Sequence, residues 1–175
     1  PSLDEFLAKS SDYDVISVRA EFTADAETPL AAYTKLSGSK PAFLFESVVG
    51  GEQVSRFSFV GFSPRKTISC GQSETKIIDR DQAPRNIPTP ADPLKLIEDE
   101  MQGIRYSGAA ADTRFSGGAV GYISYEYANR VEPSVQLPEE DQLGLPLLFF
   151  MVADLVLIFD HACQTLTICA NAYVD

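Results

Sequence analysis

The chain has 175 residues, 45% of them hydrophobic and 22% charged, a composition typical of one soluble globular domain covering residues 1–175. Its net charge is −11 and no cluster of lysine or arginine offsets it, so the sequence argues against a nucleic-acid partner. The longest apolar stretch, Leu147 to Asp160, contains Asp154 and is shorter than the ~18 residues that a membrane-spanning helix needs. We therefore expect no membrane association.

Three cysteines, Cys70, Cys163 and Cys169, occur without CxxC spacing. An odd number of scattered cysteines disfavours a disulfide framework and favours a reducing compartment. The chain also begins without a basic and apolar leader, so we expect a cytoplasmic location.

The first forty residues predict a helix, a strand and a second helix. Ser2 and Glu5 form a capping-box pattern, which predicts a short helix at the start. Residues Val15 to Phe22 alternate between apolar and polar, the period of a half-buried strand. Thr28-Pro29 is an N-cap followed by proline in the first turn, and this helix is expected to end near Gly38.

The stretch from Phe43 to Pro64, FLFESVVGGEQVSRFSFVGFSP, predicts a β-hairpin with paired glycines at the bend. Four polar residues interrupt its apolar arms: Glu46, Ser47, Arg56 and Ser58. One interpretation is that Glu46 pairs with Arg56 across the hairpin while Ser47 faces solvent. Because neighbours in a strand point to opposite faces, Glu46 and Ser47 cannot both face one ligand unless the strand breaks or one residue acts through its backbone.

The middle of the chain predicts two more strands, Thr67–Ser69 and Thr75–Asp79, followed by a proline-rich connection between Gln82 and Pro93. Asp92-Pro93 then starts a helix that ends near Gly103. In the segment that follows, Arg114 to Arg130, glycines inside a strand indicate close approach by another backbone.

The last part predicts two buried strands that meet near Asp154, a turn at Asp160 to Cys163, and a final strand from Thr165 to Tyr173. Hairpins separated by short helices indicate an α+β fold, in which antiparallel sheets form a β-sandwich flanked by helices. The only histidine, His161, falls in the predicted turn, where a bond to local backbone is the simplest interpretation. A carboxylate pair of Glu126 with Asp154 or Asp160 is conceivable for acid–base work, but the sequence does not bring these residues together.

Several motifs resemble the anthranilate synthase large subunit, a chorismate-utilising family. Leu44-Phe45-Glu46-Ser47 is similar to the family's "LLES" arm, and Arg56-Phe57-Ser58 to its Arg-aromatic-Ser arm. Residues Arg114 to Tyr122, RFSGGAVGY, match its RFxGGAVGY segment, and Phe159-Asp160-His161 resembles its FDH motif. The similarity covers nearly the whole chain and implies the family's α/β/β/α fold.

The resemblance implies the amino-terminal, tryptophan-sensing domain of component I, whose parent enzyme makes anthranilate and pyruvate from chorismate and glutamine-derived ammonia. It implies tryptophan contacts through Glu46 and Ser47, with Arg56 and Ser58 as further candidates. The implied partners are tryptophan as inhibitor, a catalytic carboxy-terminal domain and a glutamine amidotransferase subunit. The family's chorismate- and Mg²⁺-binding residues lie in a longer carboxy-terminal region, so we expect no catalytic residue, cofactor or metal ligand in this chain, and no activity from it alone.

Three alternatives stay open. The chain resembles the same domain of aminodeoxychorismate synthase, although the Glu-Ser hairpin matches that enzyme less well. It could instead be a docking module for the catalytic half and the amidotransferase that senses no ligand. A small independent enzyme using Glu126 and Asp154 is the third alternative.

Overall fold

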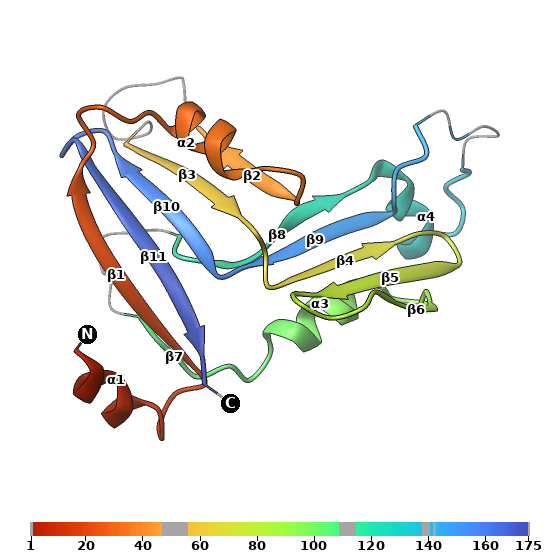
Figure 1. Cartoon of the computed structure of the whole chain (residues 1–175). Coiled ribbons are helices and arrows are strands. Elements are labelled where there is room, and N and C mark those ends of the chain that lie inside the picture. Colours follow the sequence, from red (N-terminus) through yellow and green to blue (C-terminus); the bar gives the residue numbers. More distant parts are fainter. Residues whose placement is uncertain (1, 47–55, 109–114, 138–140, 142, 175) are drawn as a thin grey trace. The chain divides into compact units, whose positions relative to one another are not determined.

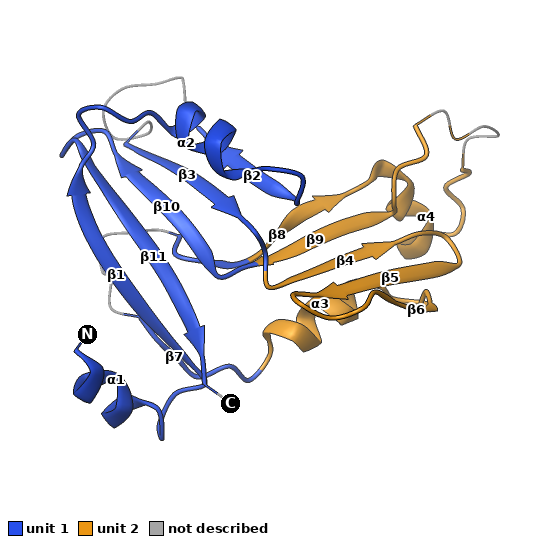
Figure 2. Cartoon of the chain, in the orientation of Figure 1, with its two compact units in different colours: residues 1–64, 103–118, 153–175 blue, residues 65–102, 119–152 orange. Residues whose placement is uncertain are grey.

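The computed structural model describes residues 2–46, 56–108, 115–137, 141 and 143–174 (Figure 1). Within these ranges the chain forms two sheets rich in antiparallel pairs and four α-helices, so the predicted α+β class is confirmed. Residue contacts divide the chain into two compact units (Figure 2). Unit 1 contains residues 1–64, 103–118 and 153–175, and unit 2 contains residues 65–102 and 119–152. That the whole chain acts as one domain stays a prediction.

Unit 1 is built on a six-stranded sheet in the order β2-β3-β10-β11-β1-β7. Its strands are β1 (Val15–Thr23), β2 (Ala42–Phe45), β3 (Phe57–Phe62), β7 (Tyr106–Ser107), β10 (Leu155–Asp160) and β11 (Thr165–Tyr173). Neighbouring strands are antiparallel, except that the short β7 runs parallel to β1. The two arms of the predicted hairpin pair as expected, with Phe45 opposite Phe59. Its predicted glycine turn lies outside the described residues.

Two helices belong to this unit, α1 (Leu3–Lys9) and α2 (Pro29–Leu36). The predicted capping box is present in α1, where Glu5 N donates to Ser2 Oγ and Ser2 N donates to Glu5 Oε2. Helix α2 covers one face of the sheet through Ala32, which packs with Val60, Leu157 and Phe159. The opposite face therefore carries the other set of alternating side chains.

That opposite face holds a series of aromatic rings. Phe43 lies 5.0 Å from Phe45 and 6.0 Å from Phe115, measured between ring centroids, and Phe59 lies 5.6 Å from Phe115. Gly61, the cross-strand partner of Phe43, leaves the space that the Phe43 ring occupies. The aromatic face continues toward the start of β3, where Phe57 lies 6.2 Å from Phe59.

Unit 2 is built on a five-stranded sheet in the order β6-β5-β4-β9-β8. Its strands are β4 (Lys66–Cys70), β5 (Glu74–Asp79), β6 (Arg85–Pro88), β8 (Gly118–Ile123) and β9 (Leu148–Ala153). Its helices are α3 (Leu94–Met101), α4 (Ala128–Val131) and the 3₁₀ helix η1 (Tyr125–Tyr127). The core of this unit consists of apolar side chains from strands β4, β5 and β9 and from helix α3: Ile68, Cys70, Ile77, Ile97 and Leu148.

The proline-rich connection from Gln82 to Pro93 differs from its prediction. Part of it is a strand, β6, which pairs with β5 and places Arg85 opposite Ile77. Because β6 is at the edge of its sheet, Pro88 can end the strand without removing a donor from an interior ladder. Four prolines therefore did not exclude a short edge strand.

The predicted close approach of backbone to a strand glycine is found at Gly121. A Cβ built on Gly121 would lie 1.9 Å from the carbonyl oxygen of Phe149 and 2.7 Å from the Cα of Phe150, both in the neighbouring strand β9. Backbone atoms cannot rotate away as a side chain can. The glycine is therefore required by the packing of β8 on β9.

We predict that Gly121→Ala lowers the free energy of unfolding by about 3 kcal/mol, the upper part of the range for overpacking. Gly38→Ala is the matched control, because a Cβ there meets no atom within 4 Å and only its φ of +53° opposes the change. That backbone conformation costs about 1 kcal/mol. Urea denaturation of both variants measures the difference, and equal losses would contradict a backbone clash at Gly121.

Candidate functional site

Two of the sequence motifs lie side by side in unit 1. Arg56 immediately precedes β3, and Asp160 ends β10. Because β3 and β10 are antiparallel with Phe57 opposite Asp160, the Arg-Phe-Ser segment lies beside the Phe-Asp-His segment. The site where they meet is called the Arg56–Asp160 corner below, and it consists of Arg56, Ser58, Asp160, His161 and Cys163.

The corner is held together by a bidentate ion pair. Arg56 Nε donates to both carboxylate oxygens of Asp160 at 3.1 and 3.0 Å, and Arg56 Nη2 donates to Oδ2 at 2.6 Å. Asp160 Oδ1 also accepts the backbone N–H groups of Ala162 and Cys163, which closes the turn after β10. The guanidinium carbon of Arg56 lies 4.8 Å from the centre of the Phe57 ring, within cation–π range. The interpretation in which Arg56 pairs with Glu46 is therefore wrong.

This pairing changes the acid–base properties of both groups. The hydrogen bonds from Arg56, aided by the backbone donors of the turn, hold the pKa of Asp160 below its ordinary value of 3.8. The same bonds raise the pKa of Arg56. The carboxylate is mostly shielded, with 13% of its side chain exposed, whereas the Arg56 side chain is 41% exposed. The Arg56 side chain is thus partly within reach of ligands, although its charge is balanced by that of Asp160.

Ser58 and His161 form a second contact in the corner. Ser58 Oγ and His161 Nε2 lie 2.7 Å apart and share a hydrogen bond. Ser58 is 2% exposed, and its position two residues before Val60 places it on the face covered by α2. The backbone N–H of His161 donates to the carbonyl of Arg56, so both the backbone and the ring of this histidine bond to residues in or next to β3, far away in the sequence. The expectation that His161 bonds to local backbone is therefore wrong.

A pocket of about 230 Å³ opens beside Arg56 on the sheet face opposite α2. Four strands of unit 1 and the turn after β10 contribute its lining: Glu21, Arg56, Phe57, Ile158, Asp160, Cys163, Thr165 and Thr167. One cation, two carboxylates, two hydroxyls, one thiol and two apolar side chains therefore surround one space. Such a set can bind a small molecule that carries both charges and an apolar part.

The predicted ligand residues do not share one place. Arg56 lines the pocket, whereas Ser58 is buried beside His161 and is not among the lining residues. Glu46 is exposed and follows β2 directly, one step beyond the cross-strand pair of Phe45 and Phe59. Ser47 lies outside the described residues. A role for these four side chains toward a ligand stays a prediction.

The sequence did not single out most of the other pocket residues. Asp160 lies in the FDH motif, so that motif could have indicated it. Thr165 and Thr167 lie opposite Asp160 and Ile158 in the β10–β11 hairpin, whereas Glu21 reaches the pocket only because β1 pairs with β11 in the register that places it opposite Thr167. No local pattern predicts a long-range register of this kind.

Two further classes of site are not formed by the described residues. No three histidine, cysteine, aspartate or glutamate side chains of the described ranges gather into a group that could hold a metal ion. None of the helices formed by these residues is long and apolar enough to cross a membrane. Cys70, Cys163 and Cys169 are all free thiols.

Comparison with known proteins gives relatives across the whole chain. It is 35% identical over 175 residues to anthranilate synthase component 1 of Acetivibrio thermocellus, covering 100% of this chain and 35% of that protein. It is 37% identical over 171 residues to the probable anthranilate synthase component 1 of Schizosaccharomyces pombe, covering 97% of this chain and 31% of that protein. No protein-family model matches the chain.

The fold is also found in a solved structure. Anthranilate synthase component I from Streptococcus pneumoniae TIGR4 aligns with a TM-score of 0.54 and 23% identity over 88% of this chain and 32% of that one. The resemblance stated from the motifs is confirmed: over nearly its whole length the chain is similar to part of anthranilate synthase component 1. It spans about a third of the length of these relatives.

We predict that Asp160→Asn destabilises the chain at pH 7 by about 1 kcal/mol, a value reduced because Arg56 is partly solvent-exposed. Since the pKa of Asp160 is lowered in the folded state, its stabilisation is complete above about pH 4 and is lost as pH falls through the folded pKa. The stability difference between variant and wild type should therefore shrink below about pH 4. Urea denaturation from pH 7 to pH 2.5 measures it, with Asp81→Asn as the control for loss of one carboxylate. A difference that persists unchanged at low pH would contradict the ion pair.

Proposed function

We propose that this chain is the amino-terminal, tryptophan-sensing part of an anthranilate synthase component I that acts in the cytoplasm. The complete enzyme would convert chorismate and glutamine-derived ammonia to anthranilate and pyruvate. The observation that carries the proposal is the pocket at the Arg56–Asp160 corner, which lies between two motifs that the family resemblance singled out. The chain would regulate this reaction and not catalyse it.

The charges of the pocket suit a free amino acid. A guanidinium carries five N–H donors, and the bonds to Asp160 use those on Nε and Nη2. Pairing with Asp160 therefore leaves donor capacity on Arg56 for the carboxylate of a ligand. The carboxylate of Glu21, on the β1 side of the same pocket, is suited to the ligand's ammonium group.

The remaining lining suits the rest of a tryptophan molecule. Phe57 and Ile158 offer an aromatic and an aliphatic surface, and Thr165 and Thr167 offer hydroxyl groups. An aromatic pair contributes about 0.5–1.5 kcal/mol beyond the free energy that comes from the surface area it buries. Glu46, which directly follows the hairpin arm β2, remains part of the proposal, and so does Ser47, which lies outside the described residues.

The partners and the metal belong to the same proposal. A catalytic carboxy-terminal domain and a glutamine amidotransferase subunit would associate with the chain, and Mg²⁺ would serve the reaction in the catalytic domain. The acidic residues described in this chain do not gather into a metal site, so none is assigned to Mg²⁺. The names of the relatives favour anthranilate synthase over aminodeoxychorismate synthase.

In the complete component I, Arg56→Gln should raise the tryptophan concentration for half-inhibition about ten- to a hundredfold, because a hydrogen bond to a charged group is lost. Turnover without tryptophan should stay close to wild type. Arg105→Gln is the matched control: Arg105 also forms a bidentate pair, with Asp14, but does not line the pocket. Its inhibition curve should not move.

Two results would contradict the proposal. If wild-type enzyme is insensitive to tryptophan, the chain is a docking module and not a sensor. If Arg56→Gln and Arg105→Gln shift inhibition equally, the pocket is not the tryptophan site.

A further inference from the structure

We propose that Cys163 is a site of reversible thiol modification, at which small disulfides that carry an amino-acid end attach within the pocket of the Arg56–Asp160 corner. The attached group would occupy the space in which tryptophan is proposed to bind and would make the sensor insensitive. This consequence rests on the proposed function, whereas the modification depends only on the thiol and on the residues around it.

The thiol of Cys163 lies where a small molecule can reach it. Cys163 is free and exposed, and it lines the pocket of about 230 Å³. Its backbone N–H donates to Asp160 Oδ1 at 3.1 Å, and Arg56 Nη2 donates to its sulfur at 3.7 Å. Both members of the ion pair therefore contact this residue, so the interaction that shapes the corner also positions the sulfur beside the pocket.

The other two thiols are shielded from such reagents. Cys70 and Cys169 are each 0% exposed. Burial raises the pKa of the Cys70 thiol, which lowers the fraction present as thiolate. The sulfur of Cys169 lies 3.2 Å from Ser17 Oγ and donates to the carbonyl of Ser116 at 3.4 Å. Because buried cysteines are generally inert and exposed ones react, the fold directs a thiol reagent to Cys163.

The charged groups of the pocket select the kind of disulfide that reacts. Arg56 retains N–H donors suited to a carboxylate, and Glu21 lines the same pocket with a carboxylate suited to an ammonium group. An α-amino acid carries both charges on one carbon, and cystine, the disulfide of cysteine, presents such an end close to its sulfur atoms. Glutathione disulfide carries a net negative charge, which the carboxylates of Glu21 and Asp160 would repel.

The reaction is a thiol–disulfide exchange. The Cys163 thiol loses its proton to solvent, and the thiolate attacks one sulfur of cystine. A new S–S bond joins Cys163 Sγ to one half of the reagent while the original S–S bond breaks. The other half leaves as a thiolate and takes up a proton, so cystine is the oxidant and Cys163 is oxidised to the mixed disulfide. A second small thiol reverses the step.

Such a step would link the pocket to the thiol–disulfide balance of its surroundings. In a reducing compartment, which the cysteine pattern favours, Cys163 stays free and the pocket stays open. Where small disulfides accumulate, the mixed disulfide forms and the attached group lies among the lining residues.

Mass spectrometry of the 175-residue chain after incubation with cystine tests the modification. We expect a single cysteinyl group, removable by dithiothreitol and located at Cys163 by peptide mapping. Cystine should modify Cys163 about tenfold faster than the uncharged 2-hydroxyethyl disulfide, because the charged end is recognised. Each rate is divided by the rate at the same peptide of the chain unfolded in urea, which removes the difference in intrinsic reactivity.

Two pocket variants test the recognition of the amino-acid end. Arg56→Gln should remove most of the preference for cystine, and Glu21→Gln, which leaves the ion pair intact, should also lower it. Arg105→Gln is the control outside the pocket and should keep the preference. Circular dichroism verifies that each variant is folded. Modification of a buried cysteine as fast as Cys163, or equal normalised rates for the two disulfides, would overturn the proposal.

The complete component I tests the consequence. Treatment with cystine should raise the tryptophan concentration for half-inhibition about tenfold, and dithiothreitol should restore it. Cys163→Ser should give one inhibition curve before and after treatment. Wild-type enzyme that never responds to tryptophan would overturn the proposed function and this consequence, while the mass spectra alone decide the modification. Modified wild-type enzyme that keeps its original inhibition curve would overturn the consequence alone.

Discussion

The bidentate ion pair between Arg56 and Asp160 joins residues 104 positions apart and ties the start of β3 to the end of β10. A planar guanidinium fits a carboxylate in one arrangement, so the pair positions both strand ends. The turn after β10 depends on the same carboxylate, which accepts two of the turn's backbone N–H groups. One interaction thus positions the turn, the nearby Phe57 ring and one wall of the pocket.

A partly exposed ion pair contributes little to stability when it is isolated, because water screens it. In this chain the main effect of the ion pair is to fix the position of the Arg56 guanidinium. Holding the guanidinium over Phe57 places a positive charge next to an aromatic ring in the lining of a pocket that Glu21 also lines. This arrangement would favour a free amino acid as the ligand of the proposed sensor.

Local chemistry made much of the fold predictable. The capping box at Ser2, the Thr28-Pro29 helix start and the alternation of β1 each depend on residues close in sequence, and each is found in the structure. The close approach at Gly121 was also indicated by a glycine within a strand. The family motifs singled out Arg56, which lines the pocket and pairs with Asp160 in place of the expected Glu46, and its contact with a ligand stays a prediction.

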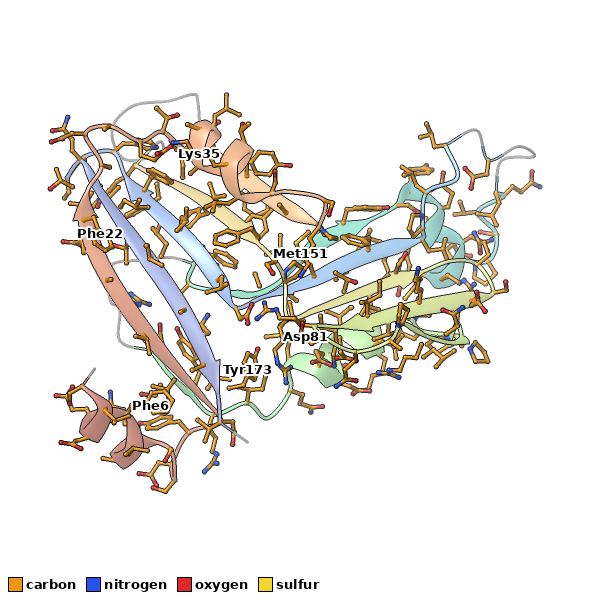
Figure 3. All side chains as sticks on the ribbon, in the orientation of Figure 1. Phe6, Phe22, Lys35, Asp81, Met151 and Tyr173 are labelled. Atoms are coloured by element: carbon orange, nitrogen blue, oxygen red, sulfur yellow. The ribbon has the colours of Figure 1, made fainter. Side chains whose placement is uncertain are left out.

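What could not be predicted depends on long-range register. Alternation along β1 indicated a half-buried strand, but Phe22 of its apolar face is exposed (Figure 3). Whether this side chain is covered depends on which elements lie beside β1, and the local sequence does not encode that. The same holds for Glu21, which reaches the pocket through the pairing of β1 with β11, a strand far away in the chain. Ser58 is a further example. It is a polar residue in a core strand, and its hydrogen-bond partner, His161, lies 103 residues away in the sequence.

Hydrogen–deuterium exchange of the complete component I, with and without tryptophan, tests the central claim most directly, because it reports where the ligand stabilises the backbone. We predict that tryptophan slows exchange in peptides covering residues 56–60 and 160–165, with little change in β5 and β6 of unit 2. Tryptophan that inhibits the enzyme while leaving exchange at these two segments unchanged would contradict a tryptophan site at the Arg56–Asp160 corner.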